Sequence, residues 1–189
     1  MGRGTVAVVV DQQPVGSLRR LDPQDLGDHL DRLYRAAWAL CGSREDAEDL
    51  VQETYVRVLS RPRWLRGDDD LGYLLRALRN TYVSRARAGA ARPRPASLDA
   101  RPEQQIEGAA GPPPEHALEV SAVFAAIAQL PEHYRLAIVA VDVAGLSYRQ
   151  AARVLRVREA TITTRLHRAR TSVARSLGDA PRPHEVNAR

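Results

Sequence analysis

Apolar residues recur with a helical period through most of the chain. After Gly42 they occupy the i, i+3, i+4 and i+7 positions of one helix face, at Ala47, Leu50, Val51, Thr54, Tyr55, Val58 and Leu59. Similar stripes predict helices at residues 25–40 and from residue 71 onward, and four more between residues 120 and 177. Two helix starts carry capping-box pairs, Ser43 with Asp46 and Ser147 with Gln150. The pattern therefore predicts an all-α fold.

Prolines divide this helical pattern in two. Six of the twelve prolines lie between Pro93 and Pro114, and a proline inside a helix removes a hydrogen bond and clashes with the preceding turn. We therefore predict two small helical domains, at residues 21–89 and 116–178, joined by an extended Pro-rich linker at residues 90–115. Residues 1–20 and 179–189 are expected to be loose tails.

Composition narrows the classes of protein that fit. The 189 residues include no apolar run long enough to cross a bilayer and no segment shaped like a signal peptide, so a cytoplasmic protein is expected. The net charge is +5 and lysine is absent, so arginine supplies the basic side chains, which weakly favours a nucleic-acid partner. We find no phosphate-binding glycine loop, nucleophile elbow or paired His or Cys ligands, and expect neither an enzyme nor a bound metal or cofactor.

The last two predicted helices have the proportions of a helix-turn-helix. A short helix after Ser147 leads through the turn "RVRE" into a long helix with an apolar inward stripe. In this motif the second helix enters the major groove, where arginine and threonine can contact bases and phosphates. The candidate contacts are Arg158, Thr161, Thr163, Thr164, Arg165 and Arg168. The alternative interpretation is a helical bundle with arginine on a solvated face.

Two further faces are charged. The helix after Ser43 has an acidic outer side that includes Asp49 and Glu53, which is either a solvated surface or a docking patch for a basic partner. On the next helix, three arginines and Asn80 lie opposite the apolar stripe, an arrangement suited to following phosphates or meeting a base. The preceding segment "RPRWLRGDDD" offers Trp64 for stacking, and we interpret its aspartates as helix caps rather than metal ligands.

Three segments resemble, in order, one known family. "GLSYRQAARVLRVREATITTRLHRAR" resembles the C-terminal domain of the extracytoplasmic-function (group IV) bacterial sigma factors. "SREDAEDLVQETYVRVL" is similar to the polymerase-binding helix of that family, and "YLLRALRNTYVSRARA" is similar to its promoter-melting helix. The resemblance extends over about residues 25–177 and also includes the Pro-rich linker.

The resemblance implies a sigma factor that binds core RNA polymerase, directs it to upstream (−35) and downstream (−10) promoter elements and promotes DNA melting. Residues 21–89 would be sigma region 2 and residues 116–178 sigma region 4. The implied partners are promoter DNA, the clamp of the large polymerase subunit, the flap of the other large subunit and an anti-sigma factor. The implied polymerase contacts are Asp46, Asp49, Gln52 and Glu53. The implied contacts to the melted downstream strand are Trp64, Arg66, Arg76, Arg79, Asn80 and Arg87.

The chain departs from the family pattern in the helix-turn-helix. Arg156 stands where a turn glycine is common, so the turn must avoid a left-handed conformation or tolerate its cost. Thr163 stands where a basic residue is common, and "REA" at residues 158–160 replaces a motif with Pro and Gly. Two other functions stay open: a transcriptional regulator that binds no polymerase, which co-purification with core polymerase would distinguish, and a nucleic-acid enzyme, which a nuclease or nucleotide-hydrolysis assay would reveal.

Overall fold

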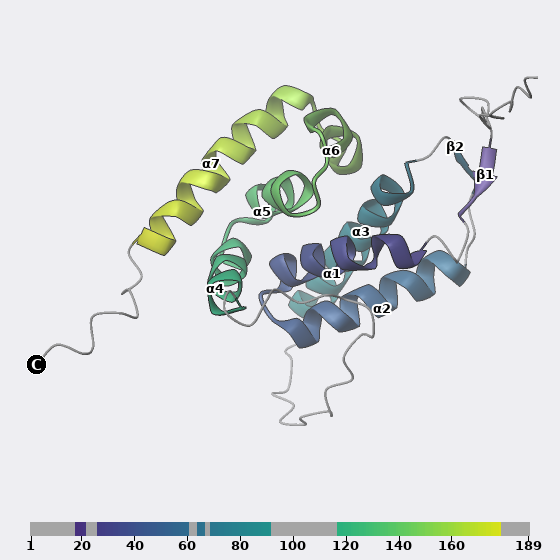
Figure 1. Cartoon of the computed structure of the whole chain (residues 1–189), viewed down its shortest axis with the longest axis horizontal. Helices are drawn as coiled ribbons and strands as arrows, with labels where there is room; N and C mark the ends of the chain where they lie inside the picture. The colour runs from purple at the N-terminus through teal and green to yellow at the C-terminus, as the bar shows by residue number, and fades with distance from the viewer. Residues whose placement is uncertain (1–17, 22–25, 61–63, 67–68, 92–116, 179–189) are drawn as a thin grey trace, which may run out of the picture.

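The computed structural model describes residues 18–21, 26–60, 64–66, 69–91 and 117–178 (Figure 1). The helices are α1 (Gly27–Cys41), α2 (Arg44–Ser60), α3 (Asp70–Ala91), α4 (Ala117–Ala128), α5 (Glu132–Ile138), the π-helical turn η3 (Val139–Val143), α6 (Tyr148–Leu155) and α7 (Glu159–Gly178). The two short strands are β1 (Leu18–Arg20) and β2 (Trp64–Arg66). The all-α class predicted from the sequence is confirmed, with one small strand pair added to it.

The first three helices form one unit, and α2 shows how the sequence sets its limits. The Ser43 side chain accepts a hydrogen bond from the backbone N–H of Asp46 at 3.2 Å and donates one to the Asp46 carboxylate at 2.9 Å. This cap starts α2 at the place the sequence predicts. The predicted inward stripe is buried except at Tyr55, which is half-buried, and at its end, where Leu59 is 49% exposed. The prediction of an inward Leu59 was wrong, because the buried face of α2 ends one residue earlier, at Val58.

The strand pair lies where no regular structure was predicted. Leu18–Arg20 runs antiparallel to Trp64–Arg66, so the end of the predicted N-terminal tail is part of the fold. Helix α3 continues to Ala91, beyond the predicted domain boundary at residue 89. The rest of the predicted linker to residue 115, residues 1–17 of the N-terminal tail and the C-terminal tail at 179–189 lie outside the described residues.

The second unit comprises α4 to α7. Helix α5 continues directly into η3, and Gly145 in a left-handed conformation (φ +72°) follows the end of this pair. The predicted capping box of Ser147 and Gln150 starts α6, and Arg156 ends it with φ 56° and ψ 47°. The turn therefore adopts the left-handed conformation without a glycine and tolerates its cost.

The two units pack against each other. Helix α1 lies between α2 and the second unit and contacts α4 and η3, while α3 contacts α6 (Figure 1). Trp38 meets Phe124 edge to face, with ring centroids 4.9 Å apart. Arg135 donates hydrogen bonds to the carbonyl oxygen of Leu40 at 3.1 Å and to the hydroxyl of Tyr82. The buried apolar residues of both units thus form one continuous core. Among the described residues, no helix is long and apolar enough to span a membrane.

Candidate nucleic-acid and polymerase interfaces

Helix α7 packs through its inward stripe, and most of its other side is exposed to solvent. Ile162, Leu166, Ala169 and Val173 are buried against the rest of the second unit. The capping box fixes the start of α6, because the backbone N–H of Ser147 donates to the Gln150 side chain at 2.9 Å and the Gln150 N–H donates to Ser147 Oγ at 3.3 Å. A short supporting helix, a tight turn and a long helix with an exposed outer face make up the helix-turn-helix that the sequence predicts.

The structure brings most of the predicted duplex contacts together. Arg158, Thr163, Thr164 and Arg168 are exposed, whereas Thr161 and Arg165 are half-buried. An open hollow of about 530 Å³ is lined by His133, Tyr134, Arg158, Ala160, Thr161, Thr164, Arg165 and Arg168. Thr163 lies outside this hollow. His133, Tyr134 and Ala160 were not among the predicted contacts, because residues 134–143 form a mostly apolar helical segment and alanine carries no polar signal.

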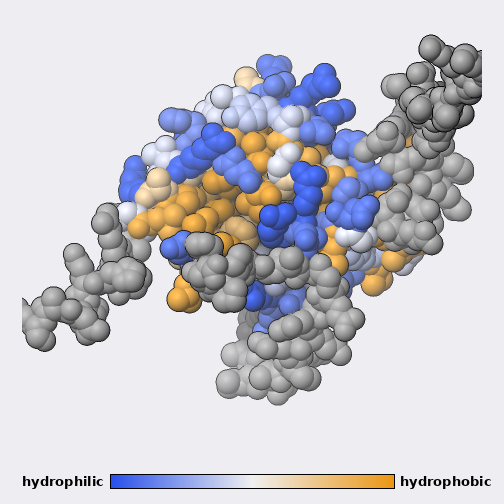
Figure 2. Space-filling model, viewed as in Figure 1, coloured by the Kyte–Doolittle hydropathy of each residue, from blue (hydrophilic) through white to orange (hydrophobic). Residues whose placement is uncertain are grey.

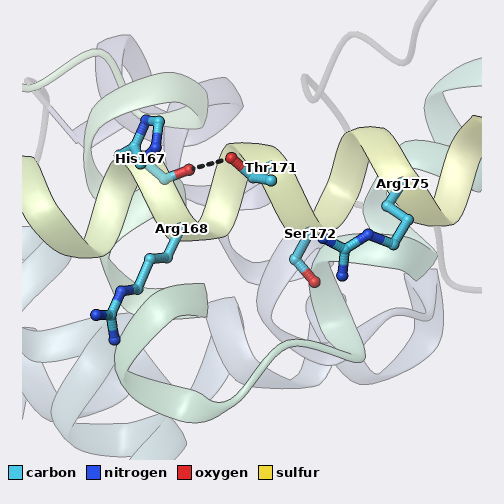
Figure 3. A pocket seen from close by; sticks show the side chains of 5 residues that line it. All are labelled: His167, Arg168, Thr171, Ser172 and Arg175. Atoms are coloured by element: carbon cyan, nitrogen blue, oxygen red, sulfur yellow. Dashed lines mark hydrogen bonds between the residues drawn. The ribbon is translucent and has the colours of Figure 1, made fainter.

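Arg168 is tied to α5. Its Nη1 donates to the Tyr134 hydroxyl at 3.0 Å, and this hydrogen bond raises the pKa of the guanidinium. Arg168 also lines a second hollow of about 350 Å³ farther along α7, where Figure 3 shows it on the same side of the helix as Ser172 and Arg175. Arg168 therefore stands between the two hollows, with its guanidinium held by another helix.

Arg170 is held by the protein itself. Its guanidinium makes two hydrogen bonds to the Asp142 carboxylate in η3, at 2.9 and 2.7 Å. The hydrogen bond to this carboxylate raises the pKa of the Arg170 guanidinium above its usual value. The bidentate pair pins α7 to η3, so Arg170 differs in role from the outward-facing arginines of the same helix.

The acidic face of α2 is only partly free. Glu53 forms ion pairs with Arg57 at 2.6 Å and with Arg85 of α3 at 2.5 Å. Asp46 belongs to the Ser43 cap, whereas Asp49 and Gln52 are exposed. Val56, 63% exposed, lies one turn beyond Gln52 on the same side. The outer face of α2 thus combines exposed polar groups with the apolar side chain of Val56, which was not predicted to belong to it.

The arginine stripe of α3 likewise contains both exposed and half-buried side chains. Asn80 and Arg87 are exposed. Arg76 and Arg79 are half-buried, and within the described part of the chain their Nε atoms are buried without a hydrogen-bond acceptor. Arg79 donates to the Asn80 side chain through its Nη1 at 3.3 Å. Trp64 and Arg66 are placed by their backbone in β2, and their side chains lie outside the described residues.

The surface of the second unit has a hydrophilic edge and a separate apolar region. Figure 2 shows mostly hydrophilic side chains along the outer edge formed by α6 and α7, and apolar residues gathered over α4. Leu118 at the start of α4 is 85% exposed. The polar edge is therefore the side of the second unit that suits a nucleic acid.

Comparison with known proteins identifies the two helical units. The model of sigma-70 region 2 matches residues 26–92, and the model of sigma-70 region 4 matches residues 121–173. The ECF RNA polymerase sigma factor SigE of Mycolicibacterium smegmatis is 35% identical over 148 residues, which span 75% of this chain but only 56% of that protein. SigM of Mycobacterium tuberculosis, another ECF sigma factor, is 32% identical over 155 residues, spanning 79% of this chain and 74% of that protein.

A solved structure agrees with these matches. The sigma factor RpoE of Bartonella quintana, in complex with the anti-sigma factor NepR, has a TM-score of 0.62 and 25% sequence identity to this chain. The similarity covers 84% of this chain and 97% of RpoE. Both helical units, their order and their fold are thus shared with sigma factors. The chain therefore belongs to the family of extracytoplasmic-function (ECF) RNA polymerase sigma factors.

Proposed function

We propose that this chain recruits core RNA polymerase to promoters and assists their opening, with a separate face for each task. The exposed first half of α7 reads the upstream element as duplex DNA. The observation that carries this assignment is the hollow beside α7, where Arg158, Arg165 and Arg168 meet two threonines. Arginine can bind guanine through two hydrogen bonds in the major groove, and threonine can contact phosphate or a thymine methyl group.

The outer face of α2 docks on the clamp of the large polymerase subunit. Asp49 and Gln52 are exposed there and lie beside the exposed Val56. A polar rim around an apolar centre is typical of specific protein interfaces. Glu53 and Asp46 help to hold this face in place, because Glu53 forms an ion pair with Arg85 and Asp46 accepts a hydrogen bond from Ser43. The second unit contacts the flap of the other large subunit.

The side of α3 that carries Asn80 and Arg87, with Arg76 and Arg79 beside them, holds the melted downstream strand. A cationic floor that follows the backbone, together with an aromatic side chain for stacking, suits single-stranded DNA. Trp64 and Arg66 supply the aromatic and a further cation from the β2 segment. Duplex reading and single-strand capture are thus assigned to different helical units.

An anti-sigma factor is a further proposed partner. RpoE of Bartonella quintana, which shares this fold over 84% of the chain, was solved in complex with its anti-sigma factor NepR. We place all of these interactions in the cytoplasm, where bacterial RNA polymerase and DNA meet.

Transcription in vitro tests the proposal. Core polymerase and the purified chain would be combined on a genomic DNA library, and transcript starts would be mapped. We expect starts that share an upstream and a downstream element. Arg165→Ala or Arg168→Ala should relax the preference at one upstream position by about 1–3 kcal/mol. Arg35→Ala, at an exposed arginine of α1 outside this face, is the matched control. Absence of any shared element among the starts would overturn the proposal.

The polymerase contact has its own test. Asp49→Arg should weaken binding to core polymerase roughly fivefold or more, because it replaces an attraction to a basic surface with a repulsion. Asp28→Arg reverses an equally exposed charge on α1 and should leave the affinity unchanged. Titration of labelled protein with core polymerase measures both, and circular dichroism checks that the helices persist. Equal affinities for the two variants would remove Asp49 from the interface.

A further inference from the structure

The hydroxyl of Thr164 is used inside its own helix. Its Oγ1 donates a hydrogen bond to the carbonyl oxygen of Ala160 at 3.1 Å. Thr164 and Ala160 are both exposed. A threonine that makes this bond has committed its only donor, and its methyl group occupies the other branch of the side chain. Thr164 therefore has no hydroxyl donor left for a ligand, while the methyl groups of Thr164 and Ala160 remain as apolar atoms at this exposed point of α7.

These two residues occupy the part of α7 that is best placed to meet a base. Positions 160 and 164 are four apart, so they share one face of the helix, and both line the hollow beside α5. They lie in the first half of α7, the half of a recognition helix that reaches base edges. Arg165 and Arg168, which follow them along α7, line the same hollow. A small apolar patch thus lies beside two cationic groups.

We propose that Ala160 and Thr164 form a methyl-reading patch that contacts the C5-methyl group of a thymine in the upstream promoter element. Thymine is the base that presents a methyl group in the major groove, and alanine and threonine methyl groups are suited to contact it. The thymine lies next to a base pair that Arg165 or Arg168 reads. This inference rests on the proposed placement of α7 in the groove, and it adds Ala160 as a residue that determines specificity.

The competing chemistry is the Thr164 oxygen itself. A hydroxyl that donates to its own backbone can still accept a hydrogen bond, and the groove offers amino donors on adenine and cytosine. The two roles select different bases. A methyl contact requires thymine and needs no oxygen, whereas an accepting oxygen requires adenine or cytosine and needs no methyl group.

Two substitutions separate these roles. Thr164→Val keeps the methyl group and removes the oxygen, while Thr164→Ser keeps the oxygen and removes the methyl group. Each variant would be assembled with core polymerase and titrated with a duplex promoter obtained from the transcript-start mapping. In parallel duplexes, each thymine of the upstream element would be replaced singly by deoxyuridine, which pairs identically but lacks the C5-methyl group.

We expect one deoxyuridine to lower the affinity of the wild-type and Thr164→Val holoenzymes about three- to fivefold, the effect of about one buried methyl group. The same deoxyuridine should lower the affinity of the Thr164→Ser holoenzyme clearly less, because only the Ala160 methyl group then remains to contact the thymine. Thr171 is the matched control, because its Oγ1 makes the equivalent hydrogen bond to the His167 carbonyl at 2.9 Å two turns farther along α7 (Figure 3). Thr171→Val and Thr171→Ser should both keep the wild-type response.

Two results would overturn the methyl-reading patch. One is a wild-type holoenzyme whose affinity no single deoxyuridine lowers. The other is a preference that Thr164→Ser retains and Thr164→Val loses, which would assign the contact to the oxygen. Failure of the proposed function would look different, because the wild-type holoenzyme would then select no upstream element from the library. A holoenzyme that selects an element but ignores every methyl group contradicts only the present inference.

Discussion

Arg168 reaches out of its helix to the Tyr134 hydroxyl of α5, at 3.0 Å. A free arginine side chain samples many rotamers, and a contact that holds it in one arrangement lowers the cost of ordering it on DNA. The ring of His133 lies beside Tyr134, with centroids 4.1 Å apart, at the same edge of the hollow. Helix α5 therefore positions a residue of α7 that we propose to contact DNA.

Removal of the Tyr134 hydroxyl should weaken DNA binding. Tyr134→Phe keeps the ring and should weaken binding to the upstream duplex by about 0.5–1.5 kcal/mol, the net value of one hydrogen bond. The loss should fall on the base pair that Arg168 reads, which titration against a set of singly substituted promoters would reveal. In the Arg168→Ala background the same change should have no effect on affinity. Additive losses in the double variant would instead mean that Tyr134 contacts DNA independently of Arg168.

Residue types alone suggested many of the side chains that we propose for each site, but not which of them already have partners within the chain. Asp49, Gln52 and Glu53 lie within about one turn of the same helix, so the polar and partly acidic character of this face was visible in the sequence. The pairing of Glu53 with Arg85 joins residues that are 32 positions apart and depends on how α2 packs against α3. The same packing dependence hid Tyr134, because no local pattern relates it to Arg168.

At the scale of the element, the turn between α6 and α7 carries local strain. Arg156 adopts φ 56° and is the one non-glycine residue with positive φ among the described residues. A left-handed conformation costs a residue with a side chain roughly 1–2 kcal/mol relative to glycine. The sequence showed that this position departs from the family pattern, and the structure shows that the turn keeps its conformation.

Glycine at this position should therefore stabilise the fold. We expect Arg156→Gly to raise the free energy of unfolding by about 0.5–1 kcal/mol, the relieved strain less the greater entropy that glycine gives the unfolded chain. Thermal unfolding should shift upward by about 1–4 °C for a chain of this size. Arg153→Gly, at an exposed position inside α6, should lower stability by about 1 kcal/mol. A lower melting temperature for Arg156→Gly would show that the arginine side chain stabilises this turn.

Helix starts were the most predictable elements because their determinants are local. Ser43 with Asp46 and Ser147 with Gln150 are three residues apart, and both pairs form the expected caps. The strands β1 and β2 were not predicted, because three residues are too few to show an alternating pattern and their pairing joins distant segments. The outward Leu59 shows the same limit, since helical period alone does not reveal where the core stops.

At the scale of the whole molecule, the sequence predicted two helical units but not their packing against each other. Proline content marks a boundary along the chain and says nothing about contacts across it. The joint includes contacts between side chains of both units, among them Trp38 with Phe124 and Arg135 with Tyr82. Family membership, by contrast, follows from motif order, and it decides in favour of a sigma factor over a regulator without polymerase or a nucleic-acid enzyme.

Arg135 is the polar centre of this joint. It donates to Leu40 and Tyr82 of the first unit while also binding the Leu130 carbonyl at 2.8 Å within its own unit. Its guanidinium therefore satisfies acceptors on both sides at once. The joint also sets α6 against α3, the helix in which the Nε atoms of Arg76 and Arg79 are buried with no acceptor among the described residues. Loosening of the joint should then make the α3 arginines more accessible.

Arg135→Met keeps much of the side-chain volume and removes these hydrogen bonds. We expect it to lower stability by about 1.5–3 kcal/mol, the range for hydrogen bonds to a charged group, and to increase the radius of gyration measured by small-angle X-ray scattering. It should also strengthen binding of the free protein to a single-stranded downstream element. Tyr82→Phe removes only the hydrogen bond to the Tyr82 hydroxyl and should show smaller changes in the same direction. A less stable Arg135→Met protein with unchanged radius and unchanged single-strand affinity would confine Arg135 to its own unit, and the joint would then depend on the Trp38–Phe124 contact.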